Sequence, residues 1–482
     1  MSTDIEMSTG MEMSTTIPTM SRVAPASRHA VVVGGSLAGL CAARALADHV
    51  DRVTVLERDR YPDGPRVRPG VPQAHHLHVL VTSGQQALDR LFPGFLAELT
   101  AHGAVPVDVP TDVLYLTSSG WRERFSATHR LVGASRELVE WIVHRRLRAD
   151  DRIRILGGQE VVGLLPDGSG GGVAGVAVRA RGGDGRVERI AADLVVDASG
   201  RGSRAPEWLA ELGYGRPAQT RVDARLGYAS RRYTLPAGVA DGWKHILIMP
   251  NPPEETRSAV LYPLEHGRWM LTLGGIGDDA PPTDEAGFLA YLRGLRTPIM
   301  YEVIRRAEPA GPIHGFRRTS NHRRHYESMP RWPHGFLVVG DAACAFNPVY
   351  GHGMSVAART AVVLAEHLRR HPGVPGRAAQ AAVARCSATA WAIATAADLR
   401  FPGTTGDLRR RDGRLSRWYL DRVARVANRD PEVARTLTDV FHLVAPPATL
   451  LAPRTVARVL RGPVRPPLTE PPVTAAPDRD GE

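Results

Sequence analysis

The feature that most constrains the fold of this 482-residue chain is a glycine-rich turn near its N-terminus. An apolar run over residues 29–33 leads into the hexapeptide GGSLAG at 34–39, an alanine-rich helical pattern follows over 37–50, and a second apolar run covers 52–57. Strand, tight turn, helix and strand form a βαβ unit, as at the start of a doubly wound sheet. The sequence therefore predicts an α/β fold with a parallel sheet.

The turn and the end of the second strand supply candidate cofactor-binding residues. Gly34 allows the tight turn, Gly39 allows close contact between helix and strand, and Ser36 occupies the position of the usual middle glycine. Backbone N–H groups at the helix start then face a pyrophosphate. Glu57 is placed to accept hydrogen bonds from both hydroxyls of an adenosine ribose, and the adjacent Arg58 is a further candidate contact. An acidic residue here favours NAD or FAD over a phosphorylated ribose.

Composition excludes several classes of protein. The formal net charge is +11, but Lys244 is the only lysine and the arginines are spread along the chain rather than clustered. We therefore predict no nucleic-acid partner. Three cysteines exclude a disulfide scaffold and favour a cytoplasmic protein. No run of 18 apolar residues occurs, so we predict no integral membrane segment.

A cluster of three histidines raises the question of a metal site. His75, His76 and His78 lie in one short loop, but no Cys or carboxylate accompanies them at ligand spacing. We predict no metal, and we expect this loop to line the cofactor.

The pattern of elements divides the chain into five regions. Apolar strand patterns alternate with helical patterns over 29–214 and return over 331–370, and a different, strand-rich pattern lies between them. The predicted regions are a disordered tail at 1–28, a discontinuous cofactor-binding domain at 29–214 and 331–370, a substrate-covering sheet at 215–330, a helical region at 371–465, and a loose tail at 466–482.

The stretch GFLVVGDAACAFNPVYGHGM at 335–354 is long and specific. It resembles the second FAD motif of the para-hydroxybenzoate hydroxylase superfamily, the class A flavin monooxygenases. The resemblance implies a Rossmann-like FAD-binding domain, a β-sheet substrate domain and a helical C-terminal region. It also implies that Asp341 contacts the ribityl chain and that four residues lie against the isoalloxazine ring: Pro348, Gly351, Gly353 and Met354.

Further site residues follow from the same resemblance. Arg136, in GASREL at 133–138, matches the helix-start arginine that contacts the flavin's ribityl-phosphate region, and Gln73 is expected to touch the flavin. No catalytic residue is assigned beyond the flavin itself. The pocket candidates are Pro348, Tyr350 and His352.

Two more stretches narrow the resemblance. DASGRGS at 197–203 departs from the family's Gly-Ala-Asp-Gly and, with RPGVPQAHHLH at 68–78, is similar to the epoxidases of polyether antibiotic biosynthesis, the monensin and lasalocid type. The resemblance implies an FAD-dependent monooxygenase that epoxidises alkenes of a polyketide-like intermediate through a C4a-hydroperoxyflavin. It further implies a hydrophobic polyene or polyketide substrate, O₂, NAD(P)H as electron donor, and a flavin reductase or carrier protein as a further partner.

Alternative reactions remain open at this point. No acid–base pair stands out in the sequence, which favours an alkene over a phenol because phenol hydroxylation requires a base. A flavin halogenase is disfavoured, because the family's lysine after the first glycine motif and its Trp-x-Trp stretch are both missing from the sequence. A redox-neutral cyclase with structural FAD and a flavin-dependent alkene reductase share the same cofactor frame and remain as alternatives.

Overall fold

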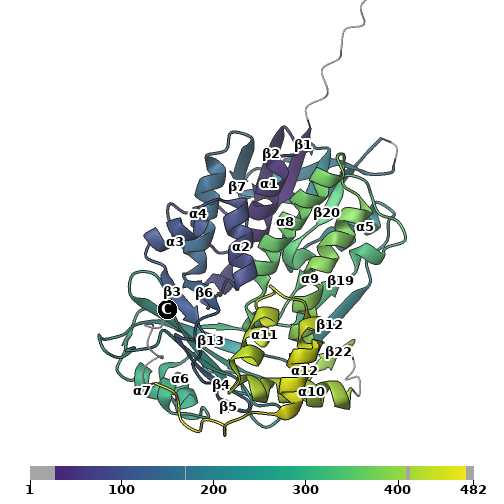
Figure 1. Cartoon of the computed structure of the whole chain (residues 1–482). Helices are drawn as coiled ribbons and strands as arrows, with labels where there is room; N and C mark the ends of the chain where they lie inside the picture. Colours follow the sequence, from purple (N-terminus) through teal and green to yellow (C-terminus); the bar gives the residue numbers. More distant parts are fainter. Residues whose placement is uncertain (1–27, 169, 318, 409–412, 474–482) are drawn as a thin grey trace, which may run out of the picture.

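The computed structural model describes residues 28–168, 170–317, 319–408 and 413–473 (Figure 1). The tail predicted at 1–28 lies outside these residues apart from Arg28, and the tail predicted at 466–482 is described only as far as Val473. Within the described ranges, no helix is long and apolar enough to cross a bilayer.

A five-stranded parallel sheet forms the upper part of the molecule in Figure 1. Each strand is a short apolar run, because helices or strands cover both faces of the sheet. The α/β fold with a parallel sheet, predicted from the sequence, is confirmed, although a three-stranded antiparallel sheet rather than a layer of helices covers much of one face. Its strands, in spatial order, are β20 (Phe336–Val338), β11 (Leu194–Asp197), β1 (His29–Val33), β2 (Arg52–Glu57) and β7 (Ile153–Gly157).

Alternation along β1 separates two cores. Ala30 and Val32 belong to one apolar cluster, and Val31 and Val33 belong to another, because successive side chains in a strand point to opposite faces. The first cluster contains α1 (Leu37–Ala47), α2 (Thr82–Leu91), α3 (Phe95–Ala101), α4 (Arg136–Arg148) and α8 (Gly353–Arg370). The second contains β8 (Gln159–Pro166), β9 (Val173–Ala180) and α5 (Ala205–Glu211), and β10 (Val187–Ala191) pairs with β9.

An eight-stranded sheet forms the lower part of the molecule (Figure 1). One of its faces packs on α6 (Glu285–Arg293) and α7 (Ile299–Ile304). Most of its strands come from the region predicted to cover a substrate, but residues 113–121 also contribute. The strands are β4 (Val113–Thr117), β5 (Gly120–Trp121), β13 (Gly227–Thr234), β14 (His245–Ile248), β15 (Ser258–Pro263), β16 (Arg268–Gly275), β17 (Glu308–Pro309) and β18 (His314–Phe316).

Smaller elements join these two parts. A two-stranded sheet pairs β3 (Val105–Val109) with β6 (His129–Gly133). A four-stranded sheet has the order β21 (Cys344–Ala345), β19 (Asn321–Arg324), β12 (Gln219–Asp223) and β22 (Thr405–Gly406). The sheet therefore links the segment before α8 to residues more than a hundred positions away.

The C-terminal part is mainly helical and packs beside the eight-stranded sheet in Figure 1. Pro446 and Pro447 interrupt the α-helices, and a short 3-10 helix, η5 (Pro447–Leu451), begins there. The hydroxyl of Thr82, in the first turn of α2, is hydrogen-bonded to His442, directly after α11. The helices are α9 (Arg377–Asp398), α10 (Arg414–Ala427), α11 (Pro431–Phe441) and α12 (Pro453–Arg461).

The glycine turn depends on two close backbone contacts. Gly34 has φ +98°, and a Cβ there would lie 2.6 Å from the carbonyl oxygen of Ala198. A Cβ on Gly39 would lie 1.8 Å from the carbonyl oxygen of Gly34. Helix α1 can therefore approach the turn only because residue 39 has no side chain.

We expect Gly39→Ala to lower the free energy of unfolding by roughly 1–3 kcal/mol, because the methyl group forces α1 away from the turn. Urea unfolding of the FAD-loaded protein measures this change. Gly168→Ala is the matched control, since a Cβ there meets nothing within 4 Å. Equal effects of the two substitutions would contradict the packing argument.

Candidate functional site

A cavity of about 610 Å³ runs along the carboxyl ends of the parallel strands and continues to the eight-stranded sheet. Val33, Leu56 and Ala198 line it at the ends of β1, β2 and β11. Ligands of open parallel sheets bind at this edge, where the strand order changes direction. Thr272 and Val260 line the opposite end, on the eight-stranded sheet.

The cavity contains most of the residues predicted from the sequence. The glycine turn, the end of β2, the start of α4 and the segment before α8 all reach it, although they are far apart in the chain. The predicted residues that line it are Gly34, Ser36, Glu57, Arg58, Gln73, Arg136, Asp341, Pro348, Gly351, Gly353 and Met354.

Glu57 has a second role that the sequence did not reveal. Its carboxylate lines the cavity and also accepts hydrogen bonds from the backbone N–H groups of Gly35, at 2.7 Å, and Asp59, at 2.9 Å. The side chain therefore fixes the glycine turn to the end of β2. Contact between Glu57 and a ribose stays a prediction.

Glu140, on α4, reaches the N-terminus of α1. Its carboxylate accepts the hydroxyl hydrogen of Ser36 and, at 3.0 Å, the backbone N–H of Leu37. Arg136, one turn earlier, donates to the Ser36 hydroxyl at 2.9 Å. Burial alone would raise the pKa of Glu140, but Arg136 and Arg68 outweigh it and hold this pKa below its usual value. Glu140 is therefore an anion that partly neutralises the helix start.

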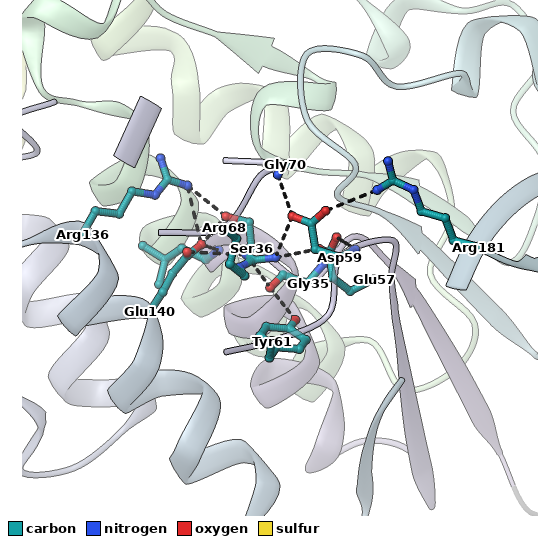
Figure 2. Close-up of polar contacts among 11 residues, drawn as sticks. Gly35, Ser36, Glu57, Asp59, Tyr61, Arg68, Gly70, Arg136, Glu140 and Arg181 are labelled. Atoms are coloured by element: carbon teal, nitrogen blue, oxygen red, sulfur yellow. Dashed lines mark hydrogen bonds and ion pairs between the residues drawn. The ribbon is translucent and has the colours of Figure 1, made fainter. Parts of the chain in front are cut away.

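Arg68 lies at the centre of this group (Figure 2). Its guanidinium is 3.5 Å from carboxylate oxygens of both Glu57 and Glu140, and 3.7 Å from that of Asp59. The residue is only 5% exposed. The hydroxyl of Tyr61 donates to the Gly35 carbonyl at 2.6 Å and closes the group on the side of the turn. Three carboxylates thus share one buried arginine, which the sequence places in an unremarkable Pro- and Gly-rich loop.

We expect Arg68→Met to lower the free energy of unfolding by roughly 3–5 kcal/mol, because three carboxylates lose their shared buried cation. Urea unfolding measures the loss. Arg181→Met is the control: Arg181 also faces Asp59, at 3.5 Å, but its side chain is 61% exposed, so we expect less than about 1 kcal/mol. A small effect at Arg68 would show that the carboxylates are balanced elsewhere.

Two pocket candidates do not face the cavity, and the prediction that they would is corrected here. The hydroxyl of Tyr350 donates to the carboxylate of Asp398 at 2.7 Å. The ring of His352 is fully buried and bonds through Nε2 to the carbonyl oxygen of Phe441, at 2.9 Å. Gly351, with φ +68°, lies between them, and both side chains are held by these partners rather than directed into the cavity. Gly39 also lies outside the cavity lining, within α1.

Asp398 organises the loop before α8. Besides Tyr350, its carboxylate accepts hydrogen bonds from the side-chain amides of Asn347, at 3.0 Å, and Asn321, at 2.6 Å. Burial raises the pKa of Asp398 to about 6 despite these donors. The network holds Pro348 against the cavity.

The raised pKa of Asp398 predicts a pH dependence of stability. The folded state binds this proton more tightly than the unfolded state, so the contribution is present below pH ~4 and is lost as the pH rises through about 6. We expect the difference in unfolding free energy between wild type and Asp398→Asn to fall by roughly 3 kcal/mol between pH 4 and 7. Urea unfolding across this range checks it, and a difference that is flat or rises with pH would contradict it.

The three histidines of the loop at 75–78 do not all face the cavity. His76 and His78 line the cavity, whereas His75 stacks on His314 outside its lining, at 3.8 Å between ring centroids. Among the described residues, no group of three His, Cys, Asp or Glu side chains is arranged to hold a metal ion.

The fold, the strand-end cavity and the glycine turn define a nucleotide-dependent redox protein. Residues 30–235 match the family model of the FAD-dependent oxidoreductases. The chain is 32% identical over 471 residues to Protein Rv3254 of Mycobacterium tuberculosis, an alignment that covers 91% of this chain and 95% of that protein. The chain belongs to the FAD-dependent oxidoreductase family and is an enzyme.

More distant relatives show how widely the fold is used. Kynurenine 3-monooxygenase of Salinispora tropica is 28% identical over 360 residues, which cover 71% of this chain and 73% of that protein. A flavoprotein/dehydrogenase from Cytophaga hutchinsonii superposes with a TM-score of 0.63 at 15% identity, over 89% and 96% of the two chains. PqsL from Pseudomonas aeruginosa, a probable FAD-dependent monooxygenase, superposes with a TM-score of 0.57 at 18% identity, over 77% of this chain and 94% of that chain. The Diels-Alderase PyrE3 superposes with a TM-score of 0.58 at 17% identity, over 86% of this chain and 80% of that chain.

Proposed function

We propose that the protein is an FAD-dependent monooxygenase. The observation that carries the proposal is the single cavity, which continues from the strand-end nucleotide site into a chamber on the eight-stranded sheet. A cofactor at the first end and a substrate at the second end would then meet in one continuous cavity. The bound cofactor and substrate would themselves displace water from this cavity, which protects a reactive oxygen species. The similarity to a kynurenine monooxygenase supports the same reaction class.

The residues fit FAD. Nε of Arg136 is buried without a hydrogen-bond partner among the described residues, as expected of a group that faces an absent anion. A Cβ added at Gly353 would meet nothing within 4 Å, so the first turn of α8 leaves space for a ring system. We propose that Arg136 binds the phosphate region, Asp341 the ribityl chain, and the N-terminus of α8 the edge of the flavin. When bound and reduced, FAD supplies the activation of O₂.

The finer proposal is epoxidation of an alkene in a polyketide-like intermediate of antibiotic biosynthesis. One oxygen atom of O₂ enters the alkene, the other leaves as water, and NAD(P)H supplies two electrons directly or through a flavin reductase. The chamber suits a hydrophobic substrate, because its walls include Leu77, Val79 and Phe346. Delivery of the substrate on a carrier protein and a cytoplasmic location stay predictions.

The alternative is a redox-neutral cyclase that keeps FAD as a structural group. The fold that the chain shares with the Diels-Alderase PyrE3 favours retaining this candidate. A flavin-dependent alkene reductase is the second alternative. A cyclase turns over without O₂ or reductant, and a reductase consumes reductant without O₂.

Rapid mixing of the anaerobically reduced holoenzyme with O₂ tests the proposal. A monooxygenase is expected to show a transient spectral species before the oxidised flavin appears, because the cavity walls shield that species from water. With ¹⁸O₂ and the terpenoid alkene limonene as probe, an epoxide that carries one labelled atom is expected. Direct reoxidation in one phase, with no labelled product, would reject the proposal in favour of the cyclase or the reductase.

A further inference from the structure

The floor of the chamber is built by alternation on three neighbouring strands. Tyr228 on β13, Ser258 and Val260 on β15, and Thr272 on β16 line the cavity. Their odd-numbered neighbours, such as Leu271, pack toward α6 and α7. This alternation places several hydroxyl groups on the cavity side of the sheet.

His76 lies against this floor. Its Nδ1 is hydrogen-bonded to the hydroxyl of Ser230, at 2.9 Å, and that hydroxyl is hydrogen-bonded to the hydroxyl of Thr272, at 2.7 Å. The ring meets Tyr228 edge-on, at 4.5 Å between centroids. Ser230 is fully buried and His76 is 4% exposed. A continuous chain of polar groups therefore runs from the sheet to an imidazole at the cavity.

A comparison with His78 shows what is unusual about His76. Nδ1 of His78 donates to the backbone carbonyl of residue 76, at 3.0 Å, and its Nε2 accepts from Arg136, at 3.1 Å, so both ring nitrogens are used. For Nε2 of His76, the described part of the chain offers no hydrogen-bond partner. A ring nitrogen at a cavity wall with no protein partner is available to a ligand.

His76 is uncharged at neutral pH. Burial, together with the nearby His314 and His75, lowers its pKa to about 3. A neutral imidazole donates at one nitrogen and accepts at the other. The hydroxyls of Ser230 and Thr272 can rotate, so the chain supports either tautomer.

We propose that Nε2 of His76 binds a hydroxyl group of the substrate, and that Ser230 and Thr272 set the tautomer that receives it. The inference rests on the proposed function and adds a substrate class to it: a largely apolar alcohol or phenol rather than a pure hydrocarbon. The apolar walls at Val260, Phe316 and Val349 receive the carbon skeleton. His76 thus fixes which part of that skeleton faces the flavin. The sequence predicted a loop at 75–78 that lines the cofactor, but it gave no sign that His76 meets the sheet.

Paired probes test the proposal on the oxidised holoenzyme, through the change in flavin absorbance on binding. The pairs are 1-naphthol with naphthalene and farnesol with farnesene, which differ by one hydroxyl group. We expect wild type to bind the hydroxylated member roughly five- to tenfold more tightly, the value of one net hydrogen bond. In His76→Phe this ratio should fall to about one while the hydrocarbon affinity is retained.

Three further variants separate a ligand contact from a structural effect. His76→Gln, which presents an amide at the same depth, should restore part of the ratio. His75→Phe should leave the ratio unchanged, since His75 does not line the cavity. If His76→Phe fails to retain FAD, Ser230→Ala is measured instead, and the ratio should fall at least twofold.

Three results would contradict the role of His76. Equal affinities within both pairs in wild type, no spectral response to either alcohol, or a ratio preserved in His76→Phe would overturn the proposal. The titration needs bound FAD but no reductant or O₂. Failure of the oxygen-mixing experiment therefore leaves this test intact, and the two proposals can fail separately.

Discussion

The buried guanidinium of Arg68 is the interaction on which the cofactor end of the cavity depends. Glu57, Asp59 and Glu140 come from the end of β2, the loop after it and α4, and each places a carboxylate within 4 Å of this one side chain. Without the arginine, three like charges would lie together away from water. Their arrangement in turn fixes Gly35 and the start of α1. Electrostatic interactions therefore determine the shape of the cavity wall together with packing.

Strand alternation determines where chemistry can occur at the opposite end. The eight-stranded sheet gives its apolar face to α6 and α7 and its hydroxyl-bearing face to the cavity. A shift of one residue in the register of β16 would turn Thr272 toward α6 and α7 and Leu271 toward the cavity. Because β13, β15 and β16 pair over six to eight residues, the polar face is held by the whole sheet rather than by any one side chain.

The sequence predicted what depends on local patterns. The parallel sheet is confirmed, and Ser36, Arg136 and Asp341 were singled out because their motifs are contiguous. Pairs distant in sequence escaped prediction: Glu140 meets Ser36 across 104 positions, and His76 meets Ser230 across 154. The prediction that Tyr350 and His352 line the cavity was wrong for a different reason. Their motif fixes where the backbone lies, but partners distant in sequence, Asp398 and the carbonyl oxygen of Phe441, hold the side chains away from the cavity.

The Asp398 network has a consequence for how the enzyme is made. The loop that carries Pro348 is held by Asp398, which lies at the end of α9, 51 positions after Asn347. A chain growing on the ribosome exposes the glycine turn and Glu57 long before Asp398 is synthesised, and domains fold as their residues emerge. The glycine turn can therefore form early, while the loop that carries Pro348 gains its last hydrogen-bond partner only when α9 is complete. If FAD binds as proposed, capture of the cofactor in its final position would be a late event in the biosynthesis of this protein.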